Sequence, residues 1–241
     1  MTDDAILFNP RPRILRQDFP NGQSCLIVDD ALLQPDRLRQ YAVDHRAEFI
    51  YAGLAAYPGV EFPMPADFNA GLDAFFMQHI RSLLGARRTL RMYSRLAMVT
   101  TPPDELLARQ WICHRDGAWV EPGQAIAASV LYLFNDASLG GTSFYAPKGS
   151  ARDADLLVHD SSTMSNEAFA AKHRVKPGYM AGSNDFFERI GRVPAKWNRM
   201  IFYDGRIFHS GEVGSPQALS GDPMTGRLTL NGFFTCSRKA S

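Results

Sequence analysis

The residues of this sequence best suited to chemistry begin with His114-Arg115-Asp116, at the end of an apolar run. Residues i and i+2 of a strand point to the same face, so the imidazole and the carboxylate would project side by side, with Arg115 turned away. A histidine from a neighbouring strand would complete a triangle of ligands, and His209 is the best candidate. Two histidines and one carboxylate leave three coordination positions open, which suits Fe(II) and O2 chemistry.

Each part of this metal site also has an ordinary explanation. A His-x-Asp triplet is short enough to arise by chance, and His209 by itself could equally be a satisfied histidine of the core or of a loop. The remaining histidines fall in predicted helices or in a long insertion, and they make no better third ligand: His45, His79, His159 and His173. The prediction that His114, Asp116 and His209 bind metal therefore depends on the motifs that lie further along the chain.

A strand near the C-terminus adds weight, because Arg227, Thr229 and Asn231 share one face of it. A half-solvated strand has this alternation, and so does a strand that lines a polar pocket inside a barrel. In the second case the arginine and its neighbouring hydroxyl could hold a carboxylate by charge-assisted hydrogen bonds. Tyr132 is either a core tyrosine with a hydrogen-bonded hydroxyl or a further carboxylate contact.

Length and composition are those of an ordinary globular protein of 241 residues, 45% hydrophobic and 21% charged, with a net charge of +1. Near neutrality no overall field favours nucleic acid or an anionic membrane, so we expect neither as a partner. No run reaches the roughly 18 apolar residues of a membrane span, and the acidic N-terminus lacks the features of a signal peptide. The odd, widely spaced Cys25, Cys113 and Cys236 indicate a reducing, cytoplasmic location.

The pattern of elements predicts a mostly-β single domain. An N-terminal strand and helical layer (25–88) contains a strand at Cys25 to Val28, helices at about 35–45 and 68–84, and a loop at 50–67. Strands follow at about 90–100, 110–115, 126–134, 142–146, 199–203, 206–209 and 226–235, which favours a sandwich or barrel. The core (90–150 and 199–235) is interrupted by an insertion at 151–198, a possible lid, with helices near 166–172 and 184–190.

As an ordered set, these residues resemble the prolyl-4-hydroxylase-like group of 2-oxoglutarate/Fe(II) dioxygenases, in a bacterial branch. The matching motifs are, in chain order, HRD at 114–116, YLFND at 132–136, GGTSFY at 140–145, FHSGEV at 208–213 and GRLT at 226–229. The resemblance covers about residues 25–48 and 90–235.

The sequence departs from the family pattern at four places, one of which is the unusually long insertion at 151–198. Phe134 replaces an asparagine, and the segment 214–225 lengthens the gap before Arg227. The stretch 98–101 offers no counterpart of a tyrosine that is common on the strand before the His-x-Asp motif. Arg206 therefore remains an alternative anion contact.

The resemblance implies a double-stranded β-helix (jelly roll) that carries Fe(II) on His114, Asp116 and His209, with 2-oxoglutarate and O2 as co-substrates. Arg227, together with Thr229 and Tyr132, would hold the distal carboxylate of 2-oxoglutarate. The implied activity is hydroxylation of an unactivated C–H bond in a peptide, an amino acid or a small metabolite. The carboxylate at 116 favours hydroxylation over halogenation, because halide would need its coordination position.

Two other classes of function remain open. One is a cupin-like metal-binding jelly roll that does not use 2-oxoglutarate, and the other is a non-catalytic binding module on the same fold. A serine hydrolase fits poorly, since no Gly-x-Ser-x-Gly elbow is present. The sequence indicates neither the substrate nor the oligomeric state. Candidate residues of the surface that the insertion would present to a substrate are Arg174, Lys176, Tyr179, Phe186 and Phe187.

Overall fold

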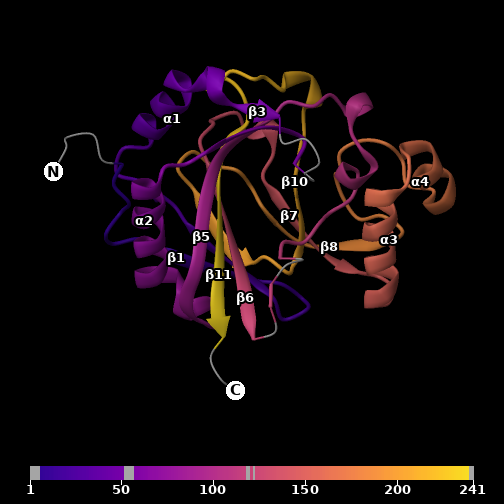
Figure 1. Cartoon of the computed structure of the whole chain (residues 1–241), viewed down its shortest axis with the longest axis horizontal. Helices are drawn as coiled ribbons and strands as arrows, with labels where there is room; N and C mark the ends of the chain where they lie inside the picture. The colour runs from indigo at the N-terminus through magenta and orange to yellow at the C-terminus, as the bar shows by residue number, and fades with distance from the viewer. Residues whose placement is uncertain (1–5, 52–56, 118–119, 122, 239–241) are drawn as a thin grey trace.

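The computed structural model describes residues 6–51, 57–117, 120–121 and 123–238, and its centre is a large antiparallel sheet (Figure 1). In sheet order the strands are β1 (Ile14–Asp18), β2 (Ser24–Val28), β9 (Met200–Asp204), β6 (Gln124–Tyr132), β11 (Leu228–Arg238), β5 (Ala86–Val99), β4 (Gly59–Pro63) and β3 (Ile50–Tyr51). Strands that are distant in sequence are therefore neighbours, and the longest of them, β5 and β11, lie side by side near the middle.

A smaller antiparallel sheet faces the large one. Its order is β10 (Phe208–Gly211), β7 (Thr142–Pro147) and β8 (Phe187–Val193). The His-x-Asp segment joins its edge through an isolated antiparallel bridge between His114 and His209. Both His residues are thus fixed by the edge of one small sheet.

Two pairs of helices lie at opposite ends of the molecule (Figure 1). The helices α1 (Pro35–Asp44) and α2 (Ala66–Phe75) pack on the outer face of the large sheet. The helices α3 (Ala151–Thr163) and α4 (Asn166–His173) lie beside the small sheet. The N-terminal helical layer predicted from the sequence is therefore present. In the described part of the chain no helix combines the length and apolarity needed to cross a bilayer.

Strand β11 is buried on both faces, which decides between the two explanations of its alternation. Leu228 and Leu230 pack into the core under α1 and α2. On the opposite face Arg227 is 3% exposed and Thr229 is 1% exposed. The half-solvated strand is therefore excluded, because the polar face points to the space between the two sheets.

The insertion differs from its predicted form. The segment 184–190, predicted as a helix starting at Asp185, is the turn before β8 and most of that strand. Asn184 Oδ1 accepts hydrogen bonds from the backbone N–H groups of Phe186 and Phe187, which builds a turn, and β8 then pairs with β7. Because β8 belongs to the small sheet, the insertion ends near residue 186 rather than 198.

Other element boundaries also differ. The helix at 151–163 was not predicted, although Ser150 and Asp153 form a capping box at its start. The expected strand at 110–115 is a short 3-10 turn followed by the single bridge at His114. Strands β3 and β4 occupy part of the predicted loop at 50–67, of which residues 52–56 lie outside the described residues. The helix predicted at 68–84 is α2 followed by a π-helical segment (Phe76–Ile80) and a 3-10 turn (Arg81–Leu84). This helical run ends at Gly85 as predicted, where φ is +70°.

The end of β2 is tied to the start of β9 by a charged cluster. Asp29 accepts hydrogen bonds from Arg199 Nε at 2.6 Å and from Lys196 Nζ at 2.9 Å. Hydrogen bonding to Arg199 lowers the pKa of Asp29 to about 2. This carboxylate therefore stabilises the attachment of the N-terminal strands to the sheet.

We predict that Asp29→Asn lowers the free energy of unfolding at pH 7 by about 1 to 2 kcal/mol. Because the folded-state pKa lies below the unfolded-state value, this stabilisation is present above about pH 4 and is lost as the pH falls toward 2. Urea unfolding of wild type and variant at pH 7 and pH 2.5 tests this, with the exposed Asp185→Asn as control. An equal difference at both pH values would contradict it.

Candidate metal centre

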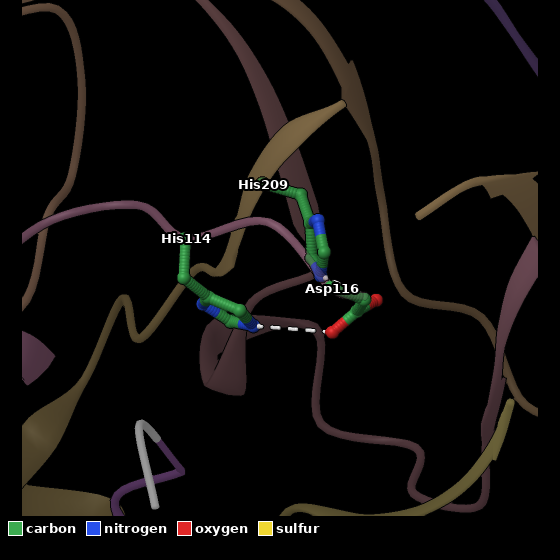
Figure 2. A group of neighbouring side chains, drawn as sticks. All are labelled: His114, Asp116 and His209. Carbon is green, nitrogen blue, oxygen red and sulfur yellow. Dashed lines mark ion pairs between the residues drawn. The ribbon is translucent and has the colours of Figure 1, made fainter. Parts of the chain in front are cut away.

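A cavity of about 420 Å³ lies between the two sheets. Side chains of β5 and β11 form one wall, and β10 with the His114–Asp116 segment forms the wall opposite. His114, Asp116 and His209 all line this cavity, and Figure 2 shows both rings and the carboxylate converging. The structure therefore brings together the three residues that the sequence singled out.

The potential ligand atoms of this triad lie within 4.8 Å of one another. His114 Nε2 is 4.0 Å from Asp116 Oδ1, and His209 Nε2 is 3.6 Å from Asp116 Oδ2. These separations are too long for hydrogen bonds but suit donors arranged around one cation. The donor set is that of a 2-His-1-carboxylate site.

Backbone hydrogen bonds fix the positions of the triad. His114 and His209 exchange both of their backbone hydrogen bonds, at 3.0 and 2.8 Å. The Asp116 N–H donates to the Gly205 carbonyl at 2.7 Å. A Cβ at residue 205 would lie 3.0 Å from the Asp116 Cβ, so a larger residue there would crowd Asp116.

The protonation pattern of the triad also suits a cation. His209 Nδ1 donates to the Ile207 carbonyl at 2.8 Å, which orients the ring so that Nε2 faces Asp116. Enclosure by protein, with further contributions from His209 and Arg95, lowers the pKa of His114 to about 3, so its ring is neutral at pH 7. Asp116 Oδ2 is buried and has no hydrogen-bond partner among the described residues. The triad thus directs three possible ligand atoms toward one point.

Arg227 occupies the same cavity and is fixed by the Gly140-Gly141 turn. Its Nε donates to the Leu139 carbonyl at 3.0 Å, and its Nη2 donates to the Gly141 carbonyl at 2.7 Å. Gly140 has φ of +79°, and a Cβ at either glycine would overlap neighbouring backbone. Thr229 lines the cavity beside this guanidinium group.

A tyrosine of this region was missed by sequence reasoning. Tyr57, from the stretch predicted as a loop, places its hydroxyl near Arg227 and Thr229, where it is buried and has no aligned hydrogen bond to the described residues. Burial raises its pKa to about 12, so it is a hydroxyl donor at pH 7. No local signal pointed to it, because residues 58–63 bring it to the cavity through the pairing of β4 with β5.

Two predicted residues lie away from the cavity wall. Tyr132 is fully buried and shares a hydrogen bond with Thr142 Oγ1 at 2.8 Å, so its hydroxyl already has a partner. Arg206, the alternative anion contact, is exposed and pairs with Asp204. Of the two candidate arginines, the structure therefore places Arg227 and not Arg206 in the cavity.

The insertion covers part of the cavity. Val158 of α3 and the loop residues Tyr179 and Met180 line it. The Tyr179 hydroxyl donates to the Thr101 carbonyl at 2.5 Å, and Arg115, which also lines the cavity, pairs with Asp155 of α3. Of the other residues suggested for this surface, Arg174, Lys176 and Phe186 line a neighbouring pocket, while Phe187 is buried in the core.

A family model described as a family of unknown function (DUF6445) matches residues 10–234. The chain belongs to this family. Among curated proteins, none matches the sequence of this DUF6445 member.

Solved structures match the fold of this DUF6445 member. The non-heme alpha ketoglutarate dependent carbocyclase SnoK from nogalamycin biosynthesis matches with a TM-score of 0.51 and 14% identity, over 90% of this chain and 81% of SnoK. A Pseudomonas putida prolyl-4-hydroxylase matches with a TM-score of 0.43 and 13% identity, over 94% of this chain and 93% of that enzyme. The expected resemblance to 2-oxoglutarate/Fe(II) dioxygenases is confirmed for the fold.

We predict that Asp116→Asn stabilises the metal-free protein while removing its response to metal. The amide would offer an N–H donor to the histidine lone pairs and would remove an unpartnered buried carboxylate. A gain of about 1 kcal/mol would raise Tm by about 2 to 4 °C. Thermal melts with and without Ni(II) test this, with the exposed Asp185→Asn as control. A metal-free variant that melts below wild type would count against this account.

Proposed function

We propose that this protein is an Fe(II)- and 2-oxoglutarate-dependent oxygenase that hydroxylates an unactivated C–H bond. The observation that carries the proposal is that one cavity holds both the His114–Asp116–His209 triad and the buried Arg227 guanidinium. A metal-chelating dicarboxylate needs these two features, a metal site for one end and a cation for the other. The fold shared with SnoK, described as alpha ketoglutarate dependent, supports the proposal.

The strand arrangement supports a double-stranded β-helix core. The central strands of the large sheet run β9-β6-β11-β5, and the facing sheet runs from the His114 bridge through β10, β7 and β8. Strands from the two halves of the chain alternate between the facing sheets, as in a jelly roll. The remaining strands of the large sheet extend this core on both sides.

His114, Asp116 and His209 would hold Fe(II), which when bound supplies activation of O2 coupled to decarboxylation of the co-substrate. The protein supplies orientation and charge. The bond from His209 Nδ1 to the Ile207 carbonyl keeps Nε2 directed at the metal position. The Asp116 carboxylate keeps one position filled, which leaves no room there for halide.

Arg227 would bind the distal carboxylate of 2-oxoglutarate. A Cβ at Gly211 would lie 3.2 Å from Arg227 Nη2, so the guanidinium group lies against β10. Gly211 is two residues beyond His209 on the same face of that strand, a distance of about 7 Å. A five-carbon dicarboxylate can extend from the metal position along this wall to Arg227, with Thr229 and the Tyr57 hydroxyl as further donors.

The insertion would exclude water from the reacting centre. Val158 and Met180 present apolar side chains to the cavity, and the Arg115–Asp155 pair fastens α3 to the His-x-Asp segment. Exclusion of water protects a reactive oxidant from side reactions. This accounts for a helical insertion placed next to the metal ligands.

The decisive experiment is to add Fe(II) and 2-oxoglutarate to protein purified without oxygen and to record the visible spectrum. We expect the weak charge-transfer band of the chelate, followed by formation of succinate when O2 is admitted. Iron binding without the band would instead indicate a cupin-like site, and failure to bind iron would indicate a non-catalytic module.

We predict that Arg227→Met weakens 2-oxoglutarate binding about tenfold or more, measured by titration of this band, because a bidentate charge-assisted contact is lost. Fe(II) binding should be unchanged. Arg206→Met is the matched control, since that side chain is exposed and lies outside the cavity. Arg227→Lys keeps the positive charge but loses the planar bidentate donors, and it should give an intermediate affinity. This variant keeps the test valid if Arg227→Met fails to fold. Equal affinity in Arg227→Met and wild type would refute this role.

Tyr57→Phe removes the hydroxyl near Arg227 and nothing else. We predict about a two- to tenfold loss of 2-oxoglutarate affinity, the contribution of one hydrogen bond. The same titration measures it, and Tyr132→Phe is the control because the Tyr132 hydroxyl is engaged by Thr142. A larger loss in Tyr132→Phe than in Tyr57→Phe would reverse the assignment.

A further inference from the structure

Besides Arg227 and Arg115, which pairs with Asp155, the cavity is lined by a further arginine that the proposed binding of iron and 2-oxoglutarate does not use. Arg95 lies on β5 directly opposite Asn231 of β11, and both side chains line the cavity. Arg227 precedes Asn231 by four residues on the same face, a distance of about 13 Å along the strand. The two guanidinium groups therefore mark two separate regions of one cavity wall.

The contacts of Arg95 leave hydrogen-bond donors available. Its Nε is 2.8 Å from Glu61 Oε1, but neither atom makes an aligned hydrogen bond to a described residue. Its Cζ lies 4.9 Å from the centre of the Phe233 ring, an additional cation–π contact. The described residues provide no hydrogen bond to its terminal nitrogens. A planar guanidinium group whose terminal nitrogens are available can donate two parallel hydrogen bonds to a carboxylate.

The surroundings of Arg95 are largely apolar. Phe233 stacks on Tyr93 with the ring centres 4.9 Å apart, and both rings line the cavity. Ile112, Val130 and Met180 complete this part of the wall. A ligand here would combine an anionic group with an apolar body.

The size and cover of the cavity limit the ligand further. Its volume of about 420 Å³ lies toward the lower end of small-molecule sites, roughly 300 to 1,000 Å³. The co-substrate would take part of this space, and Val158, Tyr179 and Met180 of the insertion cover another side. The remaining space suits a small molecule rather than a polypeptide.

We propose that Arg95 binds a carboxylate of the substrate, and that the substrate is a small organic acid with an apolar body. This inference rests on the proposed function, because it takes the Arg227 region to be filled by 2-oxoglutarate. The substrate carboxylate would accept hydrogen bonds from the terminal nitrogens of Arg95, while Glu61 stays in its ion pair at Nε. Its apolar body would lie against Phe233 and Tyr93, near the metal position.

The test compares binding of 3-phenylpropionate with that of its neutral amide, 3-phenylpropanamide, by calorimetry. The protein is kept free of oxygen and is loaded with Fe(II) and saturating 2-oxoglutarate. We expect wild type to prefer the carboxylate about tenfold. Arg95→Met should abolish the preference and Arg95→Lys should retain part of it. The matched control is Arg91→Met, on the same strand but exposed and outside the cavity, which should behave as wild type.

Three results would overturn the inference. The first is a wild type that binds both probes equally or binds neither. The second is an Arg95→Met or Arg95→Lys protein that keeps the full preference. The third is a loss of 2-oxoglutarate affinity in Arg95→Met, measured by the charge-transfer band, with the probe preference unchanged. That result would assign Arg95 to the co-substrate instead.

A second arm separates this inference from the proposed function. If wild type gives no charge-transfer band, the proposed function fails, and the two probes are then compared on metal-free protein. Loss of the carboxylate preference in Arg95→Met but not in Arg227→Met would still place the organic acid at Arg95. Loss in Arg227→Met but not in Arg95→Met would place it at the other end of the cavity and exclude our assignment.

Discussion

The reciprocal backbone bridge between His114 and His209 is the interaction on which the rest of the site depends. The side chains of the triad face one another, and Asp116 Oδ2 is buried without a hydrogen-bond partner among the described residues, which is an unfavourable arrangement. The backbone has to impose this arrangement. The paired hydrogen bonds of the two histidines and the bond from Asp116 to the Gly205 carbonyl do so. The cost of this arrangement is what a bound cation would relieve.

The two-sided burial of β11 explains how one strand serves both the core and the cavity. Leu228 and Leu230 hold it against the N-terminal helical layer, while Arg227 and Thr229 face the space between the sheets. A buried guanidinium is stable only when its donors are satisfied. The carbonyls of Leu139 and Gly141 satisfy two of them, and the group lies beside Gly211 of β10.

The insertion contributes to the site through few but specific contacts. The Arg115–Asp155 pair connects α3 to the His-x-Asp segment, and the Tyr179 hydroxyl binds the Thr101 carbonyl. These contacts place apolar residues such as Met180 over the cavity. Arg95 and Phe233 line the same cavity under these residues. The insertion therefore covers both the metal position and the part of the cavity next to Arg95.

The sequence by itself predicted the triad and Arg227 as candidates, from residue spacing, the order of the motifs along the chain and their resemblance to a known family. It also determined the helical layer and most core strands, whose periodicity is local. Only the tertiary structure decided the rest. Alternation cannot show whether the polar face of β11 meets solvent or a cavity. The segment Phe187–Val193 forms a strand, β8, because it pairs with β7, which is distant in sequence. Tyr57, Arg95 and the engaged hydroxyl of Tyr132 acquire their positions from neighbours distant in sequence, which no local pattern records.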